Sequence, residues 1–301
     1  MLLAMYSIFT FIFIGYAAKI LNLIGNQQSG ILLGFLINFA LPAQVFNGTY
    51  HAPIHLDFML VCLTSIVCNA ITGLVLFFIA KLLKLDKSTT MVFCVMGALG
   101  NTLFLGLPFV KGALGEDYAN QVVIFDQFVT GIPFAFIGPI VLSLGGKNKF
   151  SLKAVAFHLA KSPLFLALIC GLSFRLVPFH IPDWVFVPLK SLAQTATPVA
   201  LFAIGVQMSL RAFLDWKLTA VVLSGKMLVA PLLLFAFVML TKGEFSDIWR
   251  MSLIEVGMPP LVSGVAILLA AGFNGKLALN TVTFGLILSF VTTPLWLHLS
   301  S

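Results

Sequence analysis

Two stretches of this sequence combine helix-breaking and polar residues within otherwise apolar surroundings. GALGNTLFLGLP (97–108) contains Asn101 and Thr102, and EVGMPPLVSG (255–264) contains Met258, Pro259 and Pro260. Interrupted membrane helices leave free backbone N–H groups and positive dipole ends, which suit a carboxylate. We therefore predict a carboxylate site at the two breaks, with Asn101 or Thr102 as the N-cap of one following helix and Pro259 or Pro260 at the first helical position of the other. The alternative is two ordinary kinks, because Gly and Pro are frequent in membrane helices.

Three ionisable residues lie inside apolar segments, where such groups are functional candidates by default. Glu255 and Asp126 are predicted to carry a coupling H⁺ or Na⁺, and Lys226 is a candidate counter-ion for substrate or carboxylate. The alternative is a structural pair between Lys226 and one of these acids, which we favour for Lys226. Gln44 and Gln194 lie near prolines of other segments and could face substrate, although capping a local kink is the simpler role.

The composition places these residues in a helical membrane protein. Hydrophobic residues make up 60% of the chain and charged residues 9%, and the mean hydropathy is +1.09. A soluble domain carries about 25% charged residues, and a helix needs about 20 apolar residues to cross a bilayer. Ten such spans are predicted, at residues 2–22, 30–48, 57–80, 91–111, 119–143, 154–177, 184–208, 215–240, 248–271 and 276–298.

The charges lie at the ends of these spans and do not cluster, so no nucleic-acid partner is expected despite the net charge of +7. Ten basic residues against five favour, under the positive-inside rule, an orientation with both termini outside, and the cytoplasmic (inner) membrane is the expected location. The outer side would then hold Lys111, Arg175, Lys190, Lys242 and Arg250.

No cofactor or metal site is predicted from the sequence. His51 and His55 have ligand spacing, but Asp57 is the nearest third ligand and zinc sites need three or four protein ligands. The chain also lacks an H-E-x-x-H motif and a phosphate-binding loop, which argues against a membrane enzyme. A channel is a weaker alternative, because channels rarely need paired interrupted helices.

The chain also contains an internal repeat. A shift of 156 residues pairs Gly15 with Gly171 and Lys19 with Arg175, and sets ALPAQVF (40–46) on ATPVALF (196–202). A shift of 158 residues lays Asn101-Thr102 over Pro259-Pro260. We expect two five-span halves, 1–146 and 147–301, of opposite orientation, which is the sequence mark of secondary transporters. The interrupted fourth and ninth spans would cross.

The segments GNTLFLGLP, NFALPAQVF, TPVALFAIG and MPPLVSGVAILLA resemble the auxin efflux carrier family, in its bacterial branch of malate and malonate permeases. The resemblance implies an all-α fold of ten helices in two inverted repeats, like that of sodium/proton antiporters and bile-acid symporters. It further implies a scaffold from 1–50 and 152–210 and a moving transport domain from 55–145 and 213–299. By the same resemblance, the substrate site would be lined by Asn101, Thr102, Met258, Pro259 and Pro260. A homodimer through the scaffold would follow by analogy.

These features together predict a transporter of a small organic anion, a mono- or dicarboxylate, that works by elevator-like alternating access. The runner-up is a sodium- or proton-coupled cation exchanger, or a sodium-coupled symporter, of the same fold. The lipid bilayer and a small carboxylate are the expected partners.

Overall fold

The computed structural model describes residues 2–52, 56–147, 149–177, 181–208 and 215–301. These residues form α-helices and short π-helices, and their one β-like pairing is an isolated antiparallel bridge between Gly100 and Pro260. His55, which the sequence pairs with His51 as a candidate ligand, lies outside the described residues.

The described helices are those of a multi-pass membrane protein, as predicted. Six are long and apolar enough to cross a membrane, and a pair of helices bent by 67° between Lys161 and Pro163 would make a seventh. Two further apolar helices, Met5–Ile20 and Thr102–Leu114, are shorter. The ten-span inverted repeat therefore stays a prediction. The six long segments are Gln27–His51, Asp57–Leu82, Glu116–Leu144, Asp183–Gln207, Trp216–Thr241 and Gly275–Leu299.

The chain divides into two compact units, and the first comprises Met1–Ile54, Leu103–Gln127 and Phe157–Met208. Its helical segments are α1 (Leu2–Ile20), α2 (Asn26–Phe35), η1 (Leu36–Ala40), α3 (Leu41–His51), most of η2 (Thr102–Gly106), α6 (Leu107–Leu114), α7 (Glu116–Asp126), part of α9 (Leu152–Lys161), α10 (Pro163–Leu176), α11 (Asp183–Gln194) and α12 (Ala196–Gln207).

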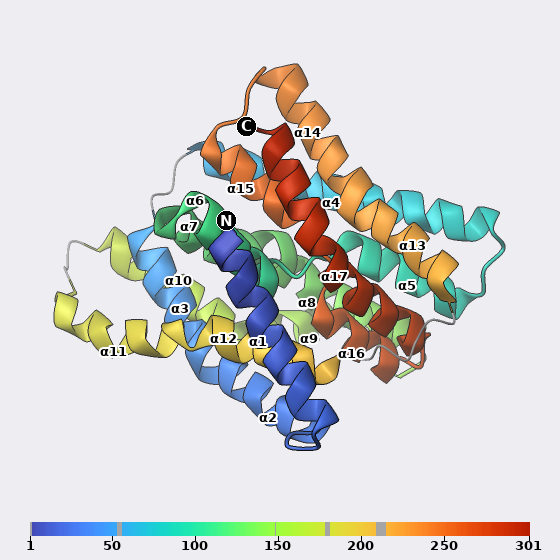
Figure 1. Ribbon diagram of the computed structural model, residues 1–301, viewed down its shortest axis with the longest axis horizontal. Helices are drawn as coiled ribbons and strands as arrows, with labels where there is room; N and C mark the ends of the chain where they lie inside the picture. Colours follow the sequence, from blue (N-terminus) through green and yellow to red (C-terminus); the bar gives the residue numbers. More distant parts are fainter. Residues whose placement is uncertain (1, 53–55, 148, 178–180, 209–214) are drawn as a thin grey trace. The chain divides into compact units, whose positions relative to one another are not determined.

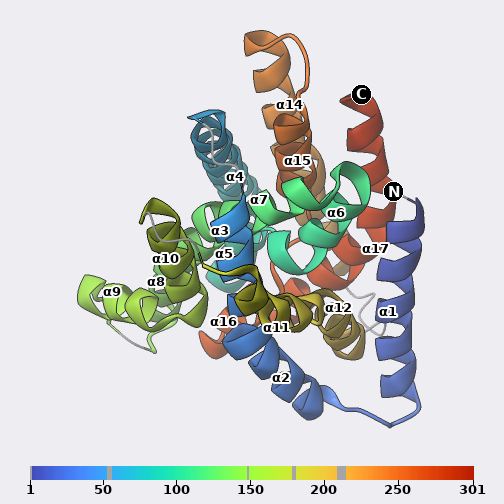
Figure 2. The same ribbon diagram turned by 90° about the vertical axis from the view of Figure 1, so that its left-hand side faces the viewer.

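Glycines set the closest helix contacts of the first unit. α1 packs on α12 (Figure 1), and a Cβ on Gly15 would overlap the carbonyl oxygen of Phe202. α10 packs on α3, which also contacts α7 (Figure 2), and a Cβ on Gly171 would lie 3.1 Å from the Phe46 carbonyl oxygen. Lipid tails are as apolar as Leu, so close backbone approach is what holds membrane helices together.

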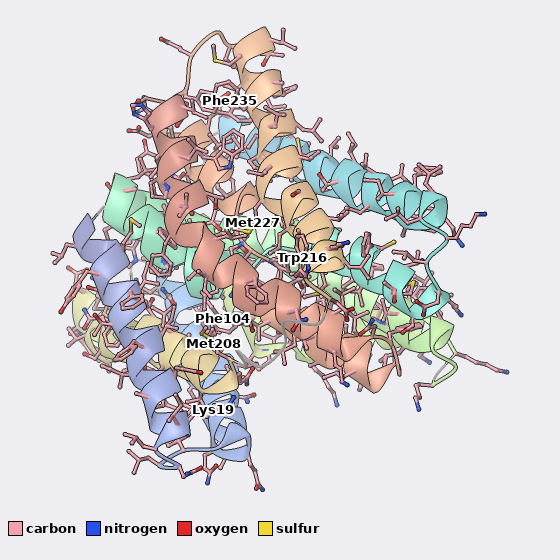
Figure 3. All side chains as sticks on the ribbon, turned by 45° about the vertical axis from the view of Figure 1, so that its right-hand side comes forward. Lys19, Phe104, Met208, Trp216, Met227 and Phe235 are labelled. Carbon is pink, nitrogen blue, oxygen red and sulfur yellow. The ribbon has the colours of Figure 1, made fainter. Side chains whose placement is uncertain are left out.

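Two basic side chains cap helix ends in the same unit. The Lys19 Nζ atom donates to the carbonyl oxygen of Met208 at 2.6 Å, and Figure 3 shows both residues. The Arg175 Nη1 atom donates to the carbonyl oxygen of Ala52. Met208 and Ala52 are the C-caps of α12 and α3, where a cation satisfies a free carbonyl and the negative dipole end.

The second unit comprises His55–Thr102, Phe128–Ala156 and Ser209–Ser301. Its core joins residues such as Phe93, Val222 and Leu268, and Figure 1 shows α17 lying along α13. Its main segments are α4 (Leu56–Leu82), α5 (Lys87–Ala98), η3 (Gln127–Gly131, from Phe128), α8 (Ile132–Leu144), α13 (Trp216–Ser224), η5 (Gly225–Val229), α14 (Ala230–Thr241), α15 (Asp247–Val256), α16 (Val262–Ala270) and α17 (Gly275–Leu299).

Each described π-helix is followed two residues later by a proline, at Pro42, Pro108, Pro133 and Pro231. A proline removes one N–H donor and clashes with the carbonyl four residues earlier, so the preceding turn widens. At η5 the proline is Pro231, and the carbonyl four residues earlier, which loses its helical partner, is that of Met227 (labelled in Figure 3). It accepts a hydrogen bond of 3.0 Å from the indole N–H of Trp296.

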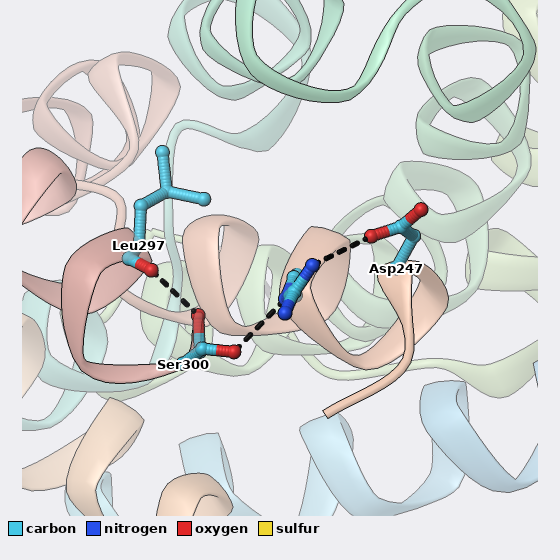
Figure 4. Close-up of polar contacts among 4 residues, drawn as sticks. Asp247, Leu297 and Ser300 are labelled. Atoms are coloured by element: carbon cyan, nitrogen blue, oxygen red, sulfur yellow. Dashed lines mark hydrogen bonds and ion pairs between the residues drawn. The ribbon is translucent and has the colours of Figure 1, made fainter. Parts of the chain in front are cut away.

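An arginine on α15 holds the end of α17 (Figure 4). The Arg250 Nε atom donates to the carbonyl oxygen of Ser300 at 2.9 Å, and its Nη1 atom bonds Asp247 at 3.1 Å. The Ser300 hydroxyl donates to the carbonyl oxygen of Leu297 at 3.1 Å. One basic side chain thus connects the C-terminal end of α17 to α15.

Candidate functional site

The two interrupted stretches singled out in the sequence meet inside the second unit. The Asn101 N–H donates to the carbonyl oxygen of Pro259 at 2.8 Å, and the Leu261 N–H donates to that of Leu99 at 3.0 Å. Gly100 and Pro260 face each other between these two bonds. Backbone at membrane depth must be satisfied by protein or water, and here each break satisfies part of the other. We name this pairing the crossing.

Asn101 and Thr102 both have buried side chains at the crossing. The Asn101 Oδ1 atom has no hydrogen-bond partner among the described residues, whereas the Thr102 hydroxyl lies 3.0 Å from that of Thr130. Helix η2 begins at Thr102, so Asn101 occupies the capping position without using its side-chain oxygen as a cap. An amide is therefore left at the start of a helix with an unused acceptor.

The other break brings Met258, Pro259 and Pro260 together, all of them buried. Gly285 on α17 makes room for the two prolines, because a Cβ there would lie 2.8 Å from Pro259 Cβ and 3.2 Å from Pro260 Cδ. We expected a proline in the first turn of the following helix, and this expectation is wrong. α16 begins at Val262, because Pro259 must stay extended for its carbonyl to bond Asn101.

Lys226 lies fully buried beside the crossing. Its Nζ atom donates to Asn69 Oδ1 at 3.0 Å and to the carbonyl oxygen of Val256 at 2.5 Å. A Cβ on Gly100 would lie 3.2 Å from that same Nζ atom. Glu255, also fully buried, interacts with Lys226 electrostatically. The cation therefore faces the C-terminal end of α15, where the helix dipole is negative.

Asp126 is buried at the end of α7 and belongs to the first unit, whereas Glu255 and Lys226 belong to the second. Its Oδ2 atom accepts a hydrogen bond of 2.9 Å from the Gln127 side chain.

Gln44 lines a cavity of about 850 Å³ that lies within the first unit. Gln194 lines the same cavity, so the two glutamines of the sequence analysis are brought together. The wall also contains Lys111 and Lys190, which sequence reasoning treated only as outer charges at span ends. α6 and α11 are far apart in the chain, so the sequence gives one indication that the two lysines lie close together. Both are predicted to lie on the outer side of the membrane.

Comparisons with known proteins agree with a membrane carrier. The family model described as "Membrane transport protein" matches residues 1–297. An uncharacterised transporter of Methanothermobacter thermautotrophicus is 24% identical over 299 residues, which cover 96% of this chain and 95% of that protein. A candidate malonate transporter of Rhizobium meliloti is 26% identical over 272 residues, 86% of this chain and 83% of that protein. The uncharacterised transporter YfdV of Escherichia coli is 26% identical over 299 residues, 95% and 93% of the two chains.

Proposed function

This chain belongs to the membrane transport protein family, the family of the auxin efflux carriers, and we propose that it moves a small organic anion by alternating access. The family model is described as a membrane transport protein, and the three relatives compared above are named as transporters. The candidate malonate transporter among them supports a mono- or dicarboxylate as the substrate. The protein would lie in the cytoplasmic membrane with both termini outside.

The crossing carries this proposal. Two interrupted segments, distant in the chain, pair through Asn101 and Pro259 and place two helix starts, η2 and α16, beside the pairing. Free N–H groups at helix starts attract anions, and discontinuous helices of this kind form substrate sites in secondary transporters. Asn101, Thr102, Met258, Pro259 and Pro260 would line the site.

Paired glycine contacts support the inverted repeat that alternating access needs. Gly15 contacts the Phe202 carbonyl, and Gly171 contacts the Phe46 carbonyl. The 156-residue shift read from the sequence turns Gly15 into Gly171 and Phe46 into Phe202. In the proposed repeat, each half would therefore make the same contact on the other half.

The two basic side chains that cap helix ends are related by the same shift of 156 residues. Lys19 donates to Met208, and Arg175 donates to Ala52. The shift of 156 residues converts Lys19 into Arg175 and Ala52 into Met208. Four pairs of positions thus support the proposed two-fold relation between the halves.

A moving domain within this repeat would expose the site to each side in turn. We propose a scaffold from 1–50 and 152–210 and a transport domain from 55–145 and 213–299, with Gln44 on the scaffold side. Residues 103–127, which this division assigns to the transport domain, belong in the structure to the first compact unit, together with most of the scaffold segments. A homodimer through the scaffold is part of the same proposal.

Glu255 and Asp126 are the proposed carriers of a coupling H⁺ or Na⁺, and Lys226 has a structural role. The fully buried Glu255 also favours the second candidate function, a sodium- or proton-coupled cation exchanger, because a buried carboxylate beside the crossing could bind a cation.

Counterflow into liposomes distinguishes the two functions. Purified protein would exchange labelled malonate, malate, succinate or indole acetate, and the Asn101→Ala variant would lose saturable exchange. Asn38→Ala is the matched control, because Asn38 is exposed on η1 and bonds only the carbonyl of Gly34. Dissipation of a sodium or pH gradient without exchange of any acid would replace the anion carrier by the cation exchanger.

A further inference from the structure

The cavity of the first unit has a charged and amide-rich wall. Five described helices, α1, α3, α6, α7 and α11, contribute to it together with the start of α12. Gln44, Asn120 and Gln194 line this wall, and their side-chain amides make no hydrogen bond with the described residues. Amides both donate and accept, so the wall can bind an anion and its water.

Two lysines and one glutamate give this wall its charge. Lys111 on α6 bonds Glu116 on α7 at 2.6 Å, and the two side chains are 52% and 62% exposed. Lys190 on α11 lines the same cavity and is exposed. Because Glu116 offsets one lysine, the three side chains together leave one net positive charge. All three remain hydrated, so their charge costs little desolvation energy.

The size of the cavity determines whether it would select small acids by their shape or by their charge. Ligand pockets span about 300–1,000 Å³, and a cavity of about 850 Å³ is roomy for a small acid. A loosely fitting ligand is selected by charge and not by shape. Charge-lined clefts raise the local concentration of an oppositely charged substrate by about 10- to 1,000-fold.

We propose that this cavity is an outer binding vestibule for dicarboxylates, in which Lys111 and Lys190 favour two negative charges over one and Glu116 limits that preference. The inference rests on the proposed function and deepens it by naming the substrate class. Both lysines lie on the side of the membrane that the sequence analysis predicts to be outside.

The electrostatic energy between a lysine and a bound acid is proportional to the charge of the acid. A lysine therefore contributes about twice as much binding energy for a dicarboxylate as for a monocarboxylate. If loss of one lysine raises the KM of a monocarboxylate about threefold, it raises the KM of a dicarboxylate about tenfold, the square of that factor. Salt weakens both effects, because the Debye length falls from about 10 Å at 0.1 M to about 3 Å at 1 M.

The test compares uptake kinetics for malonate and acetate in liposomes, at 0.1 M and 1 M salt. Lys190→Gln is expected to raise the malonate KM about tenfold, and Glu116→Gln is expected to lower it several-fold. Both changes shrink at 1 M salt, and Lys190→Arg restores the wild-type KM. Lys242→Gln is the matched control, because this exposed lysine lies at the end of α14 and not on the cavity wall.

A loss of folding cannot imitate this pattern, because two neutralising variants are expected to change KM in opposite directions. Equal KM changes for malonate and acetate, or changes that persist at 1 M salt, would overturn the vestibule while leaving the carrier intact. Absence of uptake of every acid by the wild-type protein would overturn the proposed function itself.

Discussion

Replacing Lys226 by methionine separates a structural from a transport role for this residue. In the wild-type protein the buried ammonium group holds Asn69 Oδ1 and the Val256 carbonyl oxygen and interacts with Glu255. Lys226→Met fills a similar volume but leaves these three groups without their cation. A buried acceptor that loses its donor costs about 1–3 kcal/mol.

The magnitude follows from the burial of the whole group. Lys226→Met takes the donor from two buried acceptors, which costs about 2–6 kcal/mol at about 1–3 kcal/mol each, and it also removes the electrostatic interaction with the buried Glu255. With an unfolding entropy of about 2.1 cal/mol/K per residue, a chain of 301 residues loses about 1.6 °C in Tm per kcal/mol. We therefore expect Lys226→Met to lower the Tm by roughly 3–10 °C.

Thermal unfolding in detergent measures this change, with transport followed in parallel. Lys226→Met combined with Glu255→Gln should recover part of the lost Tm, because the second change removes the uncompensated charge. Lys217→Met, at an exposed lysine of α13, should leave the Tm near the wild-type value. An unchanged Tm for Lys226→Met would refute the structural role, and a stable but inactive variant would assign Lys226 to transport.

Two further predictions concern stability in the two units. Gly15→Ala should lower the Tm by several degrees, since its Cβ would overlap the Phe202 carbonyl and overpacking costs about 1–3 kcal/mol, whereas Gly34→Ala, with open space around it, should not. Asp86 caps α5, and a hydrogen bond with the Thr89 side chain lowers the pKa of its carboxyl group. A lowered pKa stabilises the fold above about pH 3.9 and loses that effect as the pH falls through the folded-state pKa. Asp86→Ala should thus cost about 1 kcal/mol at pH 7 and progressively less below about pH 4, and equal differences in Tm at pH 7 and pH 3 would contradict this.

The position of the two breaks could be read from the sequence because Gly and Pro act locally. Gly100 and Pro260 stand in apolar stretches where a helix would otherwise continue, and they are paired in the structure. The start of α16 could not be read in this way. It depends on the bond between Asn101 and Pro259, a contact between segments far apart in the chain.

The partners of the ionisable residues also needed the fold. Three ionisable positions were visible in the sequence, but only the structure groups Lys226 with Glu255 and with Asn69. The cavity wall was invisible for the same reason, since Lys111 and Lys190 reach it from different helices. A side chain at a span end looks the same in sequence whether it anchors the protein or lines a vestibule.

The pairing at the crossing has a consequence for biogenesis. The Leu99 carbonyl and the Asn101 N–H find their partners in residues that are synthesised about 160 residues later. At about 5–20 residues per second, this delay is roughly 8–32 s. Until then the first break reaches the membrane with polar backbone that lipid cannot satisfy, so its completion must wait for the second half. A pause in translation before Pro259 should therefore expose this protein to membrane quality control.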